Sequence, residues 1–256
     1  MTVKNKGNRL RRGIFLLPSL LTLSSMLAGF YCIIQSVKYY NTGNFLYLKY
    51  ACLAILLSMV LDGLDGRVAR LTDTQSEFGA QLDSLSDMIS FGFAPGLLVY
   101  FSCHDIVSLG RLTWVVCFII PACVALRLAR FNSQDENLNK VFFRGLSSPM
   151  GAGVIVCYFW LISIEPWMQS TFYFWLGLFL SIPLSLLEVS LLRYRSFKDF
   201  DIRGKVPFYV LLILLLVLAF VILFPALTLF FIFAAYALSG PVSYVFIRFM
   251  RRAKAG

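Results

Sequence analysis

Residues 62–87 read DGLDGRVARLTDTQSEFGAQLDSLSD, and they place four aspartates, Asp62, Asp65, Asp83 and Asp87, beside two strongly apolar stretches. Moving an aspartate from water into hydrocarbon costs at least about 2.5 to 3.5 kcal/mol on insertion scales, so four of them close together need an attractive partner. Bound cations are the simplest such partner. A metal site is therefore the first hypothesis for this stretch.

The composition predicts a membrane protein. Hydrophobic residues make up 59% of the 256 residues, charged residues make up 14%, and the mean hydropathy is +0.78. A soluble domain has roughly 25% charged residues. Backbone groups inside a bilayer must pair within a helix or a closed barrel, and the long unbroken apolar runs do not alternate as barrel strands do. We expect one all-α membrane-embedded domain, residues 1–256, with about eight spans of roughly twenty residues each.

The apolar runs and the basic residues together predict the topology. Spans are expected at about 14–35, 46–72, 76–101, 112–131, 149–164, 171–190, 206–223 and 226–248. Basic residues cluster at 4–12, 193–205 and 248–254, which by the positive-inside rule keeps both termini cytoplasmic. This gives a basic cytoplasmic N-terminus (1–13), a six-helix core (14–200) and two additional C-terminal spans with a basic tail (201–256).

The net charge and the cysteines exclude two other classes of function. The net charge of +10 follows the expected topology, so we expect no nucleic-acid partner. The six cysteines lie in or beside apolar stretches and form no CxxC pair, which is typical of small buried hydrophobic residues rather than a disulfide framework or a zinc site.

Helical spacing brings the four carboxylates together. Residues three or four apart share a helical face, so Asp62 and Asp65 point the same way on the second span, while Gly79, Asp83 and Asp87 form one stripe on the third. We expect Ser76 or Thr74 to cap this third helix, and the short hinge lets the two stripes face each other. Oxygen-only ligands suit Mg²⁺ or Mn²⁺, and four carboxylates are enough for two metals about 3.5 to 4 Å apart.

Small residues and one arginine accompany the acids. Gly66, Ala69 and Gly79 leave room for a bulky group to approach the backbone. Arg70 offers a guanidinium fork for a phosphate. With metals, these residues indicate a pyrophosphate or nucleotide pocket. Close helix packing is the alternative explanation for the glycines, and topological anchoring is the alternative for Arg70, but neither accounts for the four acids.

The whole pattern, Asp62-x-x-Asp65-Gly66-x-x-Ala69-Arg70, eight residues, then Gly79-x-x-x-Asp83-x-x-x-Asp87, resembles the full signature of the CDP-alcohol phosphotransferase family. The resemblance implies a six-helix catalytic core, usually in a homodimer, with two divalent cations, Mg²⁺ or Mn²⁺. It also implies transfer of a phosphatidyl or related group from a CDP-linked donor to an alcohol, with release of CMP.

Residue roles follow from the same resemblance. It implies that Asp62, Asp65 and Asp83 ligate metal, and that Asp87 ligates metal or acts as the general base. It further implies that the CDP moiety is bound by Asp62, Gly66, Ala69, Arg70, Gly79 and Asp83. We assign Asp87 as the base, because it is the last acid on its stripe and the farthest from the hinge.

Four stretches indicate the acceptor. SLSDMISFGFAPG (84–96), RLARFN (127–132), FRGLSSPMGAG (143–153) and RYRSFKD (193–199) are similar to the membrane-embedded type of phosphatidylserine synthase. The similarity implies CDP-diacylglycerol as donor and L-serine as acceptor. Serine needs a cation for its carboxylate, and we assign Arg127, Arg130 and Arg144 to that acceptor site. Glycerol 3-phosphate or an inositol phosphate could use the same charges, an archaeal-type lipid donor is a further alternative, and each arginine could instead set the topology.

A cation transporter is the alternative from another class. It would place acids near the middle of the membrane on several helices, and it would have no use for Arg70 beside them. Acids on two adjacent helices at one membrane face favour an enzyme. We expect an integral protein of a bacterial inner membrane, with its active site facing the cytoplasm.

Overall fold

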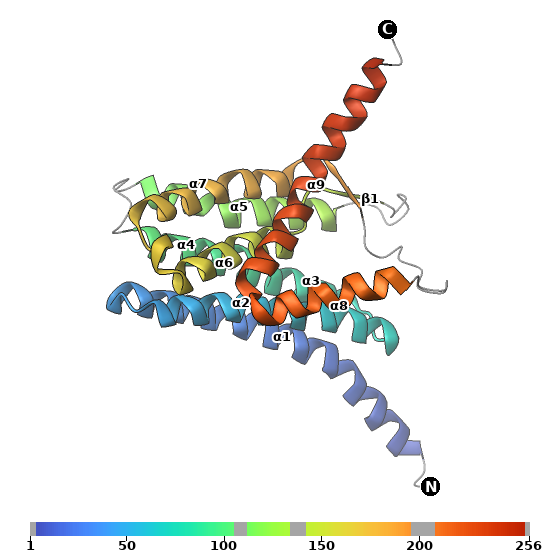
Figure 1. Ribbon diagram of the computed structural model, residues 1–256. Coiled ribbons are helices and arrows are strands. Elements are labelled where there is room, and N and C mark those ends of the chain that lie inside the picture. The colour runs from blue at the N-terminus through green and yellow to red at the C-terminus, as the bar shows by residue number, and fades with distance from the viewer. Residues whose placement is uncertain (1–3, 105–111, 134–141, 196–207, 254–256) are drawn as a thin grey trace.

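A computed structural model describes residues 4–104, 112–133, 142–195 and 208–253. Almost all of these residues are helical, and the long helices lie side by side in a bundle (Figure 1). The helices are α1 (Lys4–Thr42), α2 (Phe45–Leu71), α3 (Glu77–Asp87), the π-helix η1 (Met88–Phe93), α4 (Ala94–Cys103), α5 (Leu112–Asn132), α6 (Ser148–Ile164), the 3₁₀ helix η2 (Pro166–Met168), α7 (Thr171–Val189), α8 (Phe208–Leu223) and α9 (Pro225–Ala253). The predicted all-α fold is confirmed.

Length and composition identify the membrane-spanning helices. Within the described residues, six helical stretches are long and apolar enough to cross a membrane, and two shorter apolar helices lie at the positions of two more predicted spans, Ser148–Ile164 and Val210–Leu223. The shorter α6 is buried along its whole length from Gly151 to Ile162, because neighbouring helices surround it. The chain is therefore a polytopic membrane protein.

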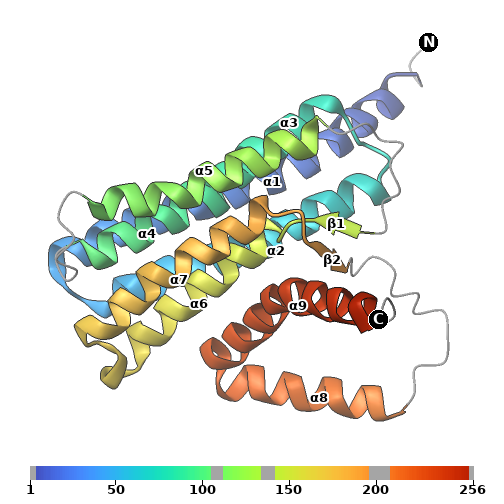
Figure 2. The same ribbon diagram turned by 90° about the horizontal axis from the view of Figure 1, so that it is seen from above.

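The bundle has two distinct ends. In Figure 2 the N-terminal part of α1, helix α3 and the strands β1 (Phe142–Arg144) and β2 (Arg193–Arg195) gather at one end, and the turns between α1 and α2 and between α6 and α7 lie at the other. The last two helices form a hairpin beside the bundle, with α9 packed against α6. The predicted division into a six-helix core and two additional C-terminal spans stays a prediction.

Two helices differ in extent from the predicted spans. Helix α1 begins at Lys4, and its candidate membrane-spanning part, Leu17–Thr42, starts near the predicted 14 but ends beyond the predicted 35. The third span is interrupted at Met88–Phe93 by a π-helical turn that no periodicity in the sequence predicts. Such turns frequently occur at functional sites.

Local side chains fix the turn between α2 and α3. Asp73 has a positive φ of 52°, which turns the chain sharply after α2. Ser76 is the N-cap of α3, and its hydroxyl accepts a hydrogen bond from the Gly79 backbone N–H at 3.0 Å. Of the two predicted caps, Ser76 is therefore the one in use.

Hydroxyl side chains connect α1 to the helices on either side of this turn. The hydroxyls of Ser25 and Ser58 lie 2.8 Å apart, which joins α1 to α2. Ser86 donates to the Thr22 carbonyl at 3.0 Å, and Ser90 donates to the Ser25 carbonyl at 3.2 Å. Small hydroxyl residues allow close helix approach and hydrogen-bond across it. Helix α1 thus holds α2 and the third span in a fixed relation.

A two-stranded sheet connects the bundle to α9. Strands β1 and β2 are antiparallel, with Phe143 opposite Tyr194. The Tyr194 side chain is buried, and its hydroxyl donates to the Ala237 carbonyl of α9 at 3.0 Å. Its ring lies where a Cβ on Gly240 would be. Glycine at 240 is therefore the residue that allows the sheet and α9 to pack together.

We predict that Gly240→Leu lowers the thermal stability of the purified protein in detergent. The new side chain must displace Tyr194, and such overpacking costs about 1 to 3 kcal/mol, or a fall in Tm of about 2 to 10 °C. Ser239→Leu is the matched control, since Ser239 is exposed on the same turn. Equal Tm values for the two variants in a thermal shift assay would contradict this packing role.

Candidate active site

The stretch 62–87 lies at the end of the bundle that also carries β1 and β2. The last turns of α2 and the whole of α3 lie on either side of the turn at 72–76. Both helices also contact α1. The predicted antiparallel arrangement of the two acidic stripes therefore follows from the hinge and from the hydroxyl contacts to α1.

Three of the four predicted aspartates form a compact group. Asp62, Asp83 and Asp87 each offer one carboxylate oxygen, and these oxygens lie within 4.8 Å of one another. All three side chains are half-buried, and Asp87 Oδ1 is buried without a hydrogen-bond partner. Oxygen ligands of this kind suit hard divalent cations. The orphaned oxygen and the converging negative charges therefore fit a bound divalent metal.

The fourth aspartate has a different environment. Asp65 is 4% exposed, and its Oδ2 accepts a hydrogen bond from the Thr22 hydroxyl of α1 at 2.6 Å. It lies near Asp62 and Asp83, with which it interacts electrostatically, but it is outside the three-residue group. Its role as a metal ligand stays a prediction. The hydrogen bond from Thr22 is a contact that sequence reasoning missed.

Among the residues predicted to frame a nucleotide, Gly66 lies beside open space on α2. A Cβ on Gly66 would meet no atom within 4 Å, so nothing in the chain occupies the space beside it. Arg70 is exposed, and its Nε donates to the Gly66 carbonyl at 2.9 Å. Gly79 lies at the start of α3, and Ala69 is half-buried one turn after Asp65. This surface has the room and the guanidinium that a diphosphate ligand requires.

One predicted acceptor residue lies next to the acidic group. Arg127 of α5 is half-buried, and its Nη1 donates to the Ser148 hydroxyl of α6 at 2.9 Å. Its Nε is buried without a hydrogen-bond partner. The guanidinium interacts electrostatically with Glu188 and Asp87. Arg127 is therefore a half-buried cation with one unused donor atom, and it interacts with one of the proposed metal ligands.

The other two predicted acceptor residues occupy different positions. Arg130 Nη1 donates to the Val189 carbonyl at 2.8 Å and Nη2 to the Glu188 carbonyl at 3.4 Å, so its guanidinium caps the C-terminal end of α7. Arg144 lies in β1, and its side chain is outside the described residues. The structure thus brings Arg127, but not Arg130, to the acidic group with an unpartnered donor atom.

Glu188 is the residue of this region that the sequence interpretation missed. It lies in the last turn of α7, is 3% exposed and has an Oε2 atom without a hydrogen-bond partner. The sequence does contain a signal, since Glu188 is the one acid between residues 171 and 190. An ionisable residue within a span is a functional candidate by default. Arg127, with which Glu188 interacts, is distant in the sequence, so no local motif contains both residues.

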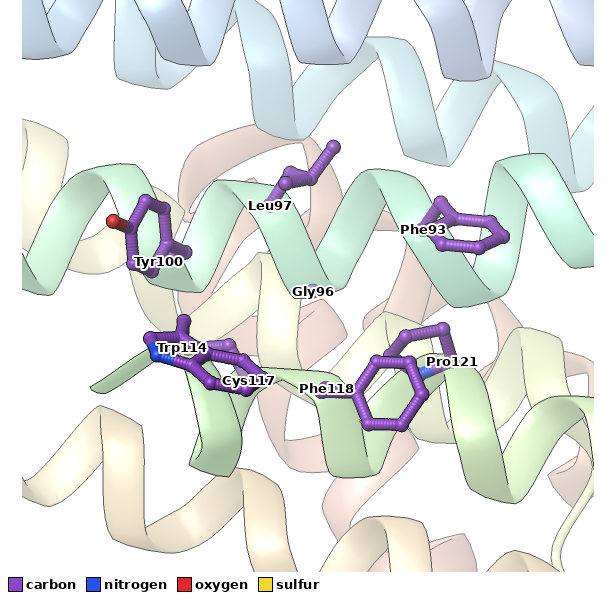
Figure 3. A pocket seen from close by; sticks show the side chains of 8 residues that line it. All are labelled: Phe93, Gly96, Leu97, Tyr100, Trp114, Cys117, Phe118 and Pro121. Atoms are coloured by element: carbon purple, nitrogen blue, oxygen red, sulfur yellow. The ribbon is translucent and has the colours of Figure 1, made fainter. Parts of the chain in front are cut away.

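A cavity away from the aspartates has a different chemical character. It lies between α4 and α5 and has a volume of about 190 Å³ (Figure 3). Figure 3 shows it lined by apolar and aromatic side chains, namely Phe93, Gly96, Leu97, Tyr100, Trp114, Cys117, Phe118 and Pro121. No carboxylate or basic group is among these lining residues. This largely apolar lining suits hydrocarbon better than a charged substrate.

Comparisons with known proteins agree on one family. The family model described as CDP-alcohol phosphatidyltransferase matches residues 15–183. A protein of Helicobacter pylori named CDP-diacylglycerol–serine O-phosphatidyltransferase is 34% identical over 240 residues, which cover 91% of this chain and 93% of that protein. Proteins of the same name are 40% identical over 149 residues in Mycobacterium tuberculosis (56% of this chain, 49% of that protein) and 38% identical over 145 residues in Methanocaldococcus jannaschii (57% and 63%).

We predict that Asp83→Asn weakens Mn²⁺ binding by about tenfold or more, because affinity at such sites depends on the number of charged ligands. Electron paramagnetic resonance of Mn²⁺ titrated into the purified protein measures this directly. Asp73→Asn is the control, since Asp73 is an exposed acid in the adjoining turn, outside the group. If both variants bind Mn²⁺ as tightly as the unaltered chain, the three aspartates are not the site.

Proposed function

The chain belongs to the CDP-alcohol phosphatidyltransferase family, and from this premise we propose that it transfers the phosphatidyl group of CDP-diacylglycerol to the hydroxyl of L-serine, with release of CMP. The observation that carries the proposal is the group of Asp62, Asp83 and Asp87 beside an open glycine-lined surface. The name of the Helicobacter pylori relative, which aligns over most of both chains, supports serine as the acceptor.

The donor half of the site would bind CDP-diacylglycerol. We assign two divalent cations, Mg²⁺ or Mn²⁺, to Asp62, Asp65, Asp83 and Asp87. When bound, such cations neutralise the donor pyrophosphate and make CMP a better leaving group. The room beside Gly66 allows the pyrophosphate to approach the α2 backbone. The exposed Arg70 guanidinium is then positioned to bind a phosphate oxygen.

Asp87 is the proposed general base. It is the last residue of α3, and one of its carboxylate oxygens is buried without a hydrogen-bond partner. A carboxylate oxygen without a hydrogen-bond partner can take the proton of the serine hydroxyl while the serine oxygen attacks the donor phosphorus. Arg127 interacts with Asp87 electrostatically, so an acceptor bound at Arg127 would place its hydroxyl near this base.

The acceptor half would recognise the serine carboxylate. Arg127 is the primary candidate because its guanidinium retains a buried Nε donor without a partner. Arg130 supports the same region by holding the end of α7. Arg144 completes the proposed set from β1. A phosphorylated acceptor such as glycerol 3-phosphate or an inositol phosphate would need the same positive charges, which makes it the comparison that an assay must include.

The proposed setting is the inner membrane of a bacterium, with the active site facing the cytoplasm. The distribution of basic residues supports this orientation, since those of the N-terminal segment 4–12 and of β2 belong to elements at the aspartate end of the bundle. The acids also lie at one end of two adjacent helices, which favours an enzyme over a cation transporter. The homodimer that the family resemblance implies stays a prediction.

We predict that the purified protein releases CMP from CDP-diacylglycerol only when both a divalent cation and L-serine are present. The measurement is CMP release with Mg²⁺ or Mn²⁺ and a panel of acceptors containing L-serine, glycerol 3-phosphate and inositol phosphate. Chelation with EDTA should abolish release, because the donor pyrophosphate then lacks its neutralising charge. Faster release with a phosphorylated acceptor than with serine would overturn the assignment.

We predict that Asp87→Asn reduces kcat by about a hundredfold or more, which is the usual contribution of a general base. Excess Mn²⁺ should not restore turnover, since an amide cannot take the proton even when the metal is bound. Asp73→Asn again serves as the matched control. An Asp87→Asn enzyme with near-normal turnover and unchanged metal dependence would show that Asp87 is not the base.

A further inference from the structure

Glu188 is a buried acid that no part of the proposed reaction uses so far. It is 3% exposed and its Oε2 atom has no hydrogen-bond partner. Burying a carboxylate without pairing it is strongly unfavourable, so a compensating positive group is expected. Glu188 also lies beyond residues 15–183, the part of the chain that the family model matches.

Arg127 is one nearby positive group among the described residues, but it does not satisfy Glu188 fully. The two side chains interact electrostatically. Arg127 Nη1 nevertheless donates to the Ser148 hydroxyl, and Arg127 Nε has no partner. Opposite charges that are buried near each other, each with a polar atom left over, can both be satisfied by a small ligand that carries both charges.

The backbone around Glu188 fixes its position. Its carbonyl accepts a hydrogen bond from Arg130 Nη2, and a Cβ on Gly145, whose φ is 87°, would collide with that carbonyl. A Cβ on Gly151 would collide with Glu188 Oε1, so the carboxylate lies directly against the backbone of α6. The carboxylate is therefore held by the fold before any ligand arrives, which favours selective binding.

The pair of Arg127 and Glu188 lies where the acceptor of the proposed reaction would bind. Arg127 interacts with both Glu188 and Asp87, so the pair lies beside the proposed base. A free amino acid carries a carboxylate and an ammonium group on the same carbon. A carboxylate bound by Arg127 would leave the ammonium within reach of Glu188. A phosphorylated acceptor has no ammonium group, and its negative charge would face Glu188, which gives discrimination by repulsion.

We propose that Glu188 binds the ammonium group of the acceptor while Arg127 binds its carboxylate, so that this buried pair of opposite charges selects a zwitterionic amino acid. This inference rests on the proposed function, because it concerns the acceptor of that same reaction. It makes Glu188 a residue that determines specificity, with no part in the chemical step.

The test compares serine with 3-hydroxypropanoate, which has the same hydroxyl and carboxylate but no ammonium group. In Glu188→Gln, kcat/KM for serine should fall by about a hundredfold, mostly through KM, because the buried ammonium loses its counter-charge. Use of 3-hydroxypropanoate should change little. The KM for CDP-diacylglycerol should stay the same. Glu165→Gln is the matched control, since Glu165 is the C-cap of α6, in the connection that leads to the start of α7, whereas Glu188 lies in the last turn of α7.

Other results would overturn the inference. Equal losses for serine and 3-hydroxypropanoate would mean that Glu188 only positions Arg127 or the end of α7. If Glu188→Gln does not fold, as judged by gel filtration, the test uses the unaltered enzyme. Equal kcat/KM values for serine and 3-hydroxypropanoate in that enzyme would exclude an ammonium-binding residue. If the unaltered enzyme releases no CMP with serine, the proposed function itself is overturned. If the unaltered enzyme uses serine and Glu188→Gln still discriminates equally between serine and 3-hydroxypropanoate, only the role of Glu188 is overturned.

Discussion

The desolvation of charged side chains is the constraint on which the rest of this structure depends. On insertion scales one aspartate at the centre of a membrane span costs about 2.5 to 3.5 kcal/mol. The four aspartates lie at the ends of their helices, where the cost of each is smaller, but carboxylates that are buried or half-buried still lose part of their hydration. The cost must therefore be offset locally. Asp65 accepts a hydrogen bond from the Thr22 hydroxyl, while the other three carboxylates converge in a group that could hold a metal ion.

Hydrogen bonds to helix α1 fix the orientation of the aspartates on the third span. Ser86 and Ser90 donate to carbonyls of α1, and these two residues are four positions apart on one face of the third span. Asp83 and Asp87 are also four positions apart, on the neighbouring face. Hydrogen bonds that fix the rotation of the serine face therefore also direct the two aspartates toward α2. A contact with no chemical role thus determines where the chemistry can occur.

The sequence predicted what depends on local spacing and missed what depends on distant contacts. The apolar runs located the helices, and the spacing within 62–87 predicted that Asp62, Asp83 and Asp87 converge. The same spacing gave no reason to separate Asp65 from them, because its partner lies 43 residues earlier in the chain. The three-residue strands β1 and β2 were also missed, since segments this short have no measurable period.

The desolvation of charged side chains also constrains the acceptor half of the site, where the residues concerned belong to no common sequence motif. Arg127, Ser148 and Glu188 come from α5, α6 and α7, and they meet only because these helices pack together. On the donor side the buried charge is all negative, so cations can balance it. On the acceptor side a positive and a negative group lie near each other, and on the proposed assignment a zwitterion balances both. Each half would then select its ligand by the charge that the folded chain leaves unbalanced.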